Sequence, residues 1–145
     1  MKRILSALLL TAAAGAPAAS ARQCVPAAPR DPKATPAYAL LAVRKASVEA
    51  ELKALSKLYT AAHPDVRGKR FELNAVMVEM EKMRASAGDR VPKLSDAYGK
   101  LVLRKVAVET ELDGLRRSYA AGHPEVSRKR DELLALGREL EELLR

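Results

Sequence analysis

Hydrophobic residues recur along most of this chain at alternating steps of three and four, the spacing of helices that bury one stripe. One such run extends from Tyr38 to Ala62 and a second from Val66 to Met83. The same two runs return from Tyr98 to Gly122 and from Val126 to Leu143. The pattern predicts four helices, and its seven-residue spacing is typical of coiled-coil-like packing.

Composition supports the same fold class. Of 145 residues, 48% are hydrophobic, 30% are charged and only 3% are aromatic, a bias found in long helices. We therefore predict an all-α protein.

The second half of the chain repeats the first. Aligning residues 32–83 with 92–143 without gaps gives 24 identities in 52 positions, which indicates one unit duplicated. The predicted segments are a disordered Pro/Ala-rich lead over 22–31, a first helical hairpin over 32–85, a linker over 86–91 and a second hairpin over 92–145.

Each unit contains one His-Pro corner. Proline disfavours helical geometry in the residue before it and lacks an amide donor, but it suits the first position of a new helix. Each corner should therefore end one helix and start the next, so that the two helices of a repeat run antiparallel. The corner residues are His63, Pro64, His123 and Pro124. Thr35 and Ser95 are the expected N-caps at the start of each hairpin.

A single hairpin of this size buries too little apolar surface to offset the entropy of ordering its backbone. The two tandem antiparallel hairpins must therefore pack on something. They either close into one four-helix bundle or open into an extended coiled coil that pairs with another copy.

Two lysines, Lys45 and Lys105, occupy equivalent positions on the predicted helical seams. A seam lysine costs stability but can set the register if a carboxylate reaches it, and we prefer this interpretation to a catalytic one. Pairing about the corners predicts that Arg44 and Lys45 lie near Glu79 and Glu81, and that Arg104 and Lys105 lie near Glu139, Glu141 and Glu142.

Basic residues also gather just after each corner, so that each hairpin has a basic tip. The tips are candidate binding sites for an acidic polysaccharide or an anionic lipid. The tip residues are Arg67, Lys69, Arg70, Arg128, Lys129 and Arg130.

Sequence motifs for catalysis are missing. The repeats share no hydroxyl nucleophile near their histidines, the sequence has no glycine-rich phosphate loop, and two histidines in separate corners make a poor metal site. We therefore predict no catalytic residue, no metal, no cofactor and no enzymatic activity. Nucleic acid is not expected as a partner, because the chain has few stacking aromatics and is predicted to be exported.

The first 21 residues are typical of a secretory signal peptide. Lys2 and Arg3 precede an apolar run, which ends before a small-residue cleavage pattern at residues 19–21. We predict an exported protein, periplasmic or secreted. Cys24, the only cysteine, is interpreted as an idle, unlipidated thiol in preference to an intermolecular link.

The pattern Tyr59, His63, Pro64 and Val66, followed by basic residues and a heptad helix, occurs again as Tyr119, His123, Pro124 and Val126. It resembles the periplasmic coiled-coil corner of polysaccharide co-polymerases, the chain-length-determinant and exopolysaccharide-export family. The resemblance covers roughly 25 residues per repeat and implies helical hairpins that project into the periplasm and assist polymer synthesis or export. This sequence shows neither the transmembrane helices nor the kinase domain of that family.

Three functions fit these observations. The first and preferred one is a non-enzymatic structural or adaptor module of the cell envelope, which docks on a partner protein or associates with itself and is linked to polysaccharide export. The second is a periplasmic chaperone that holds unfolded clients. The third is an anion-binding protein that uses the basic hairpin tips.

Overall fold

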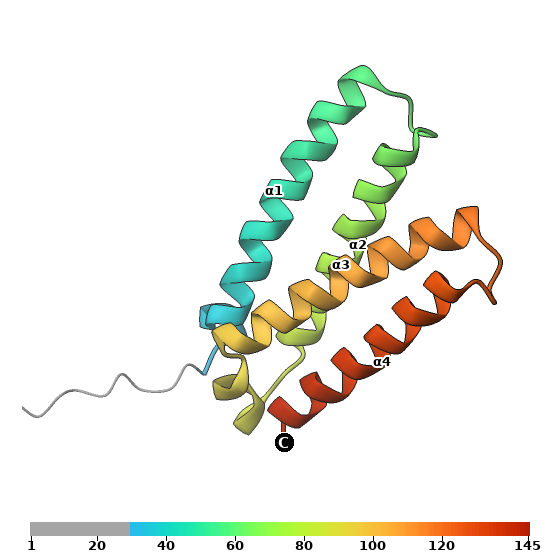
Figure 1. Cartoon of the computed structure of the whole chain (residues 1–145). Coiled ribbons are helices and arrows are strands. Elements are labelled where there is room, and N and C mark those ends of the chain that lie inside the picture. Colours follow the sequence, from blue (N-terminus) through green and yellow to red (C-terminus); the bar gives the residue numbers. More distant parts are fainter. Residues whose placement is uncertain (1–29) are drawn as a thin grey trace, which may run out of the picture.

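The computed structural model describes residues 30–145. The predicted signal peptide, Cys24 and all but the last two residues of the predicted lead lie outside the described residues. The described part consists of four long helices and two short 3-10 helices, without a strand (Figure 1). In chain order they are η1 (Pro32–Ala34), α1 (Pro36–Leu58), α2 (Pro64–Arg84), η2 (Gly88–Lys93), α3 (Asp96–Ser118) and α4 (Pro124–Leu143). The predicted all-α class is confirmed.

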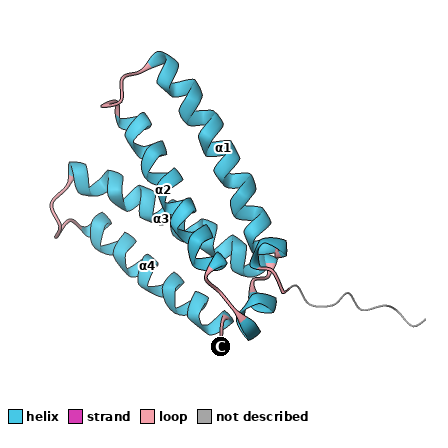
Figure 2. Ribbon diagram, turned by 180° about the vertical axis from the view of Figure 1, so that it is seen from behind, coloured by secondary structure: helices cyan, strands magenta, loops and turns pink. Residues whose placement is uncertain are grey.

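The four long helices form two antiparallel hairpins that pack on each other. Helix α1 pairs with α2 and α3 pairs with α4, while α3 also contacts both helices of the first hairpin. In Figures 1 and 2 the hairpins meet at their bases, beside η1, η2 and the C-terminus, and both corners lie at the far ends. Of the two predicted arrangements, the structure adopts the four-helix bundle.

The expected N-caps start both hairpins. The Thr35 hydroxyl accepts a hydrogen bond from the backbone amide of Tyr38 at 3.3 Å, and the Ser95 hydroxyl accepts one from that of Tyr98 at 3.2 Å. Each bond satisfies an amide that has no partner inside the helix. These two predictions are confirmed.

The largest cluster of buried side chains lies where the two hairpins meet. It draws on every long helix, because each contributes an apolar stripe to the same interior. Its members are Ala37, Tyr38, Leu41, Val76, Met80, Met83, Leu94, Tyr98, Val102, Val106 and Leu140. Smaller buried groups within each hairpin continue the packing toward the corners.

Helices α1 and α3 approach closely at Gly99. A Cβ atom added to Gly99 would lie 2.8 Å from the Cα of Ala37 and 2.9 Å from the Leu40 Cδ1. Only glycine therefore fits at this crossing without a shift of the backbone. The equivalent residue of the first repeat, Ala39, is exposed, so the two repeats use this position differently.

The first helix of each hairpin ends earlier than its apolar pattern predicted. Helix α1 stops at Leu58 and not at Ala62, and α3 stops at Ser118 and not at Gly122. Tyr59 is already extended, with φ −130° and ψ 152°. The pattern was wrong here because the apolar residues after Leu58 belong to the corner and are exposed.

No helix within residues 30–145 combines the length and the apolar character that crossing a bilayer requires.

Candidate functional site

Each corner is held by an aromatic stack and a histidine cap. The rings of Tyr59 and His63 stack with centroids 4.1 Å apart, and the His63 Nδ1 accepts a hydrogen bond from the Asp65 amide at 3.3 Å. The second corner repeats both contacts through Tyr119, His123 and Glu125, at the same distances. The histidines thus act as N-caps of α2 and α4. Sequence reasoning placed His63 and His123 at the corners beside the prolines but missed the stack and the cap, although the repeated Tyr-x3-His spacing was visible.

Behind each corner, a network of four charged side chains joins the two helices of the hairpin. In the first hairpin the Lys69 ammonium contacts the Glu51 carboxylate of α1 at 2.5 Å and the Glu72 carboxylate of α2 at 3.0 Å. Arg44 of α1 also pairs with Glu72. Lys69 and Glu72 therefore tie α2 to α1 near the tip.

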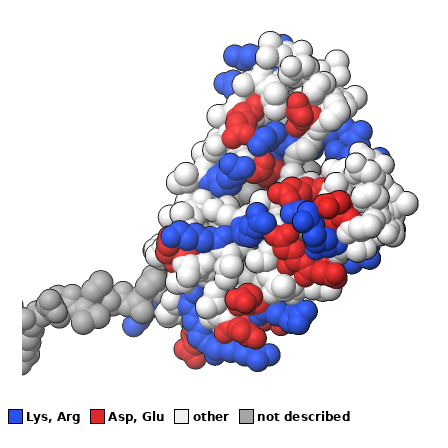
Figure 3. Space-filling view, in the orientation of Figure 1, with Lys and Arg blue, Asp and Glu red and all other residues white. Residues whose placement is uncertain are grey.

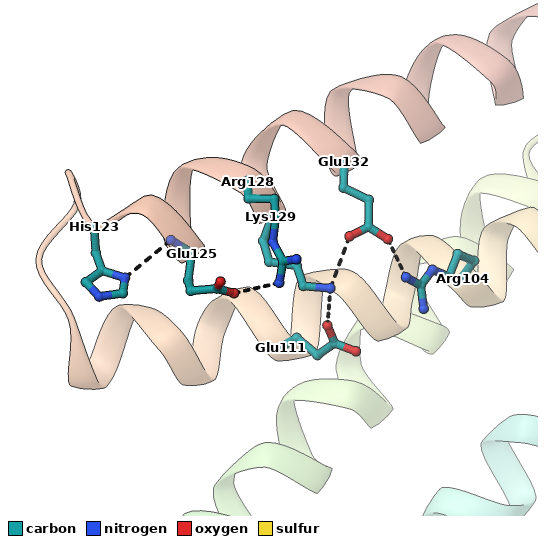
Figure 4. A network of polar contacts seen from close by, with 7 residues as sticks. All are labelled: Arg104, Glu111, His123, Glu125, Arg128, Lys129 and Glu132. Atoms are coloured by element: carbon teal, nitrogen blue, oxygen red, sulfur yellow. Dashed lines mark hydrogen bonds and ion pairs between the residues drawn. The ribbon is translucent and has the colours of Figure 1, made fainter.

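The same network recurs in the second hairpin at positions sixty residues later. Lys129 contacts Glu111 at 2.5 Å and Glu132 at 3.0 Å, and Arg104 also pairs with Glu132 (Figure 4). These are the two copies of one arrangement, because all eight residues match in the aligned repeats. The acidic members of the network were not singled out from the sequence, although their identity in both repeats was a usable signal.

Pairing within the first network shifts the pKa values of Lys69 and Glu51 so that both charged forms are favoured. Burial disfavours the charged form of Lys69, but hydrogen bonds to Glu51 and Glu72 outweigh it and raise the pKa of the ammonium above its ordinary value. The hydrogen bond from Lys69 lowers the pKa of the Glu51 carboxyl. These groups stay charged and paired at neutral pH.

Half of the predicted basic-tip residues are occupied by such contacts. Lys69 and Lys129 are held in the networks, and Arg128 pairs with Glu125 at 2.6 Å. Within residues 30–145, the remaining tip residues form no ion pair; they are Arg67, Arg70 and Arg130. The two tips therefore offer fewer free cations to an acidic ligand than the sequence suggested.

The equivalent lysines Lys45 and Lys105 have different surroundings. Lys105 reaches across to the first hairpin and contacts Glu79 at 2.6 Å, and it also contacts Glu109 on its own helix at 3.1 Å. Among residues 30–145, the one ion pair of Lys45 is with Glu49, one turn away on α1, at 2.5 Å. Lys105 thus links the hairpins, whereas Lys45 has only a neighbour on its own helix.

The predicted partners of these basic residues were wrong. Arg44 pairs with Glu72 and Lys45 with Glu49, because Glu79 faces α3 and is taken by Lys105. Glu81 points outward and pairs with Arg84 of its own helix. In the second hairpin Arg104 pairs with Glu132. The partners predicted for Arg104 and Lys105 were Glu139, Glu141 and Glu142, and none of these three forms an ion pair within residues 30–145.

The link between the hairpins is built around a buried carboxylate. Burial opposes ionisation of Glu79, but hydrogen bonds from Lys105 and Lys82 outweigh it and hold the pKa of the Glu79 carboxyl below its ordinary value. For Lys105 burial again acts against the charge, and the hydrogen bond to Glu79 again prevails, which raises the pKa of its ammonium. The pair is therefore ionised in the folded protein.

Two of the grooves on the described surface are lined by at least two large apolar side chains. The first, of about 430 Å³, lies between α2, α3 and α4 and is lined by Phe71, Glu109, Leu112, Asp113, Arg116, Arg130, Leu133 and Leu134. The second, of about 510 Å³, lies on the outer face of α2 and is lined by Asn74, Met77, Val78, Glu81, Lys82 and Ala85. We call them the three-helix groove and the α2 groove.

Charges elsewhere on the surface are mixed. On the face seen in Figure 3, acidic and basic side chains alternate over both hairpins. Among the described residues, no group of three or more His, Cys, Asp or Glu side chains is placed to hold a metal ion.

Comparisons with protein-family models, with curated proteins and with solved structures found no match.

Proposed function

We propose that this protein is a non-enzymatic, exported adaptor of the cell envelope that docks a partner protein in the α2 groove. The observation that carries the proposal is a pair of adjacent apolar side chains at the surface of α2. Met77 is 46% exposed and Val78 is 45% exposed, although both lie on a helix packed between two others. An exposed apolar patch with a polar rim is a feature of protein interaction sites.

The polar rim of the α2 groove is already neutralised. Glu81 pairs with Arg84, and Lys82 contacts Glu79 at 2.8 Å. A partner would therefore gain most of its binding energy from burial of apolar surface and little from charge. Methionine suits this role, because its flexible and polarisable side chain adapts to a partner surface.

The fold does not require this apolar pair. The equivalent residues of the second repeat are Gly137 and Arg138, and the α3·α4 hairpin adopts the same architecture with them. The comparison of these matched positions shows that a hairpin folds without the two apolar side chains, which occur only on α2. An apolar surface that is not needed for folding is best explained by binding.

The cellular setting of the proposal comes from the sequence. Export rests on the signal-peptide pattern of residues 1–21, and the link to polysaccharide export rests on the resemblance of the two corners. Polysaccharide-export proteins of the envelope are therefore the first partners to examine.

The test is site-specific photo-crosslinking in cells that export the protein. A crosslinking amino acid at position 78 should give a discrete adduct with one envelope protein, and Met77→Glu should abolish that adduct. The matched control carries the crosslinker at position 138, the equivalent position of the second repeat, and should give no such adduct. Identical adducts from both positions, or no adduct from position 78, would refute the proposal.

A further inference from the structure

A second surface combines apolar and charged side chains. The three-helix groove has an apolar lining contributed by Phe71 of α2, Leu112 of α3, and Leu133 and Leu134 of α4. Leu134 is 58% exposed. The lining spans two turns of α3, from Glu109 to Arg116, which is long enough to seat about two turns of another helix.

The charges around this groove do not cancel. Its two acidic residues are held by lysine or arginine of α3, since Glu109 contacts Lys105 at 3.1 Å and Asp113 pairs with Arg117. Arg116 and Arg130 also line the groove, and neither forms an ion pair with any residue of the 30–145 range. The groove therefore presents two free guanidinium groups beside an apolar lining. Its complement is an apolar helix face that carries carboxylates.

The C-terminal end of α4 has this chemistry. Leu143 is 40% exposed and Leu136 is half-buried, and they lie on one face of the helix at a spacing of seven residues. Glu139 lies between them on that face and Glu142 lies beside it; both are exposed, and neither forms an ion pair within the described part of the chain. We call this surface the acidic ridge.

Both surfaces are specific to the second hairpin. In the first repeat, Ser56 stands at the position of Arg116 and Asn74 at that of Leu134, so the equivalent face lacks this arginine and this apolar side chain. The counterparts of the ridge residues Glu142 and Leu143 are Lys82 and the buried Met83. Relative to the first repeat, the groove has thus gained a basic residue, Arg116, and the ridge has gained an acidic one, Glu142. The two changes are complementary in charge.

We infer that the three-helix groove of one molecule receives the acidic ridge of a second copy, with Glu139 and Glu142 facing Arg116 and Arg130. The contact must be intermolecular, because α4 is one continuous helix from Pro124 to Leu143. Residues 130–134 of α4 line the groove, and the ridge lies further along the same helix, which cannot fold back on itself. The two surfaces differ, so the association is head-to-tail and leads to rings or open chains.

The contact involves a short ridge and a short groove, which places it among weak, transient interfaces. Its strength should depend on ionic strength, because the guanidinium and carboxylate groups are at the surface. This inference does not depend on the partner docking proposed for the α2 groove, because the two grooves share no lining residue.

Sedimentation equilibrium of the full exported chain at increasing concentration tests the inference. The wild type should associate reversibly, and the association should weaken at high salt. The pair Arg116→Glu and Arg130→Glu should weaken self-association at least about tenfold. The pair Glu139→Arg and Glu142→Arg should weaken it equally. Circular dichroism and urea denaturation of each variant confirm that the fold is retained.

The decisive arm mixes the two charge-reversed variants. The reversed groove of one variant complements the reversed ridge of the other, and the unchanged ridge of the first matches the unchanged groove of the second. The mixture should therefore associate into alternating rings or chains, although each variant alone self-associates at least about tenfold more weakly than the wild type. Arg70→Glu is the matched control: it reverses the first-repeat counterpart of Arg130 and should leave self-association unchanged. The inference is overturned if the wild type remains monomeric at millimolar concentration, if reversal at Arg116 and Arg130 has no effect, or if the mixture fails to associate.

Discussion

The two hairpins of this protein have the same local construction but different surroundings. Both contain the stacked corner, the histidine cap and the four-residue charge network at equivalent positions. Helix α2, however, contacts both α1 and α3, whereas α4 lies at the edge and packs mainly on α3. Six residues of α2 are buried but only two of α4. Equivalent positions of the repeat are therefore buried on α2 and more exposed on α4. The comparison shows that the repeat specifies the hairpin, and that position in the bundle decides burial.

This difference also gives equivalent positions of the two repeats different surroundings. Gly99, Lys105 and Glu79 make contacts between the hairpins. Of their counterparts, Ala39 and Glu139 are exposed, and Lys45 is partly buried but pairs only within its own helix among residues 30–145. The same substitution made at both equivalent positions therefore shows how much of its effect on the free energy of unfolding comes from the residue type and how much from its place in the bundle.

The largest effect is expected at the close crossing of α1 and α3. Gly99→Ala adds a methyl group that would lie 2.8 Å from a backbone atom of Ala37, so the helices must move apart. We expect a loss of about 1–3 kcal/mol in the free energy of unfolding, measured by urea denaturation. Gly114→Ala, in the same helix but in open space, should instead gain up to about 1 kcal/mol from helix propensity. Equal responses of the two variants would rule out a steric role for Gly99.

The second comparison uses the equivalent lysines. The Lys105 side chain is 19% exposed, and Lys105→Ala leaves the buried Glu79 with Lys82 as its one remaining cationic partner within residues 30–145. We expect a loss of about 2 kcal/mol in the free energy of unfolding. Lys45→Ala removes a contact within one exposed helix face and should cost under about 0.5 kcal/mol. If both variants lose the same amount, Lys105 has no special role between the hairpins.

A smaller difference is expected within the duplicated charge network. Glu72 is buried between the helices, whereas its counterpart Glu132 is only half-buried. Glu72→Gln should lower the free energy of unfolding by about 1 kcal/mol, because a neutral amide replaces the buried acceptor of two cations. Glu132→Gln should cost less, since water screens the pairs at the edge of the bundle. Thermal unfolding followed by circular dichroism measures both, and a larger effect of Glu132→Gln would reverse the comparison.

The smallest expected effect is a pH dependence of the link between the hairpins. Folding lowers the pKa of the Glu79 carboxyl, so its contribution to stability is fully present above the ordinary value of 4.5 and is lost as the pH falls through the lowered value. The difference in unfolding free energy between wild type and Glu79→Gln should therefore shrink on acidification below about pH 4.5. Folding raises the pKa of the Lys105 ammonium, so its contribution persists below 10.5 and is lost only as the pH rises through the raised value. Urea denaturation of the wild type and of Glu79→Gln at several pH values around 4.5 measures this difference in unfolding free energy. A difference that stays constant on acidification would contradict the lowered pKa of Glu79.

Sequence alone determined the features that depend on neighbours along the chain. The apolar spacing predicted four helices, the duplication predicted two hairpins, and the cap positions Thr35 and Ser95 were correct, because propensity, capping and proline geometry act over a few residues. Only the tertiary structure decided which face of each hairpin meets the other. The repeats have nearly the same pattern, and periodicity alone does not distinguish a stripe that packs within its own hairpin from one that packs on the next. For the same reason the partner of Glu79, the glycine crossing at Gly99 and the uncovered side of α4 could not be predicted: each is set by contacts between segments that are distant in sequence, and their energies depend on burial.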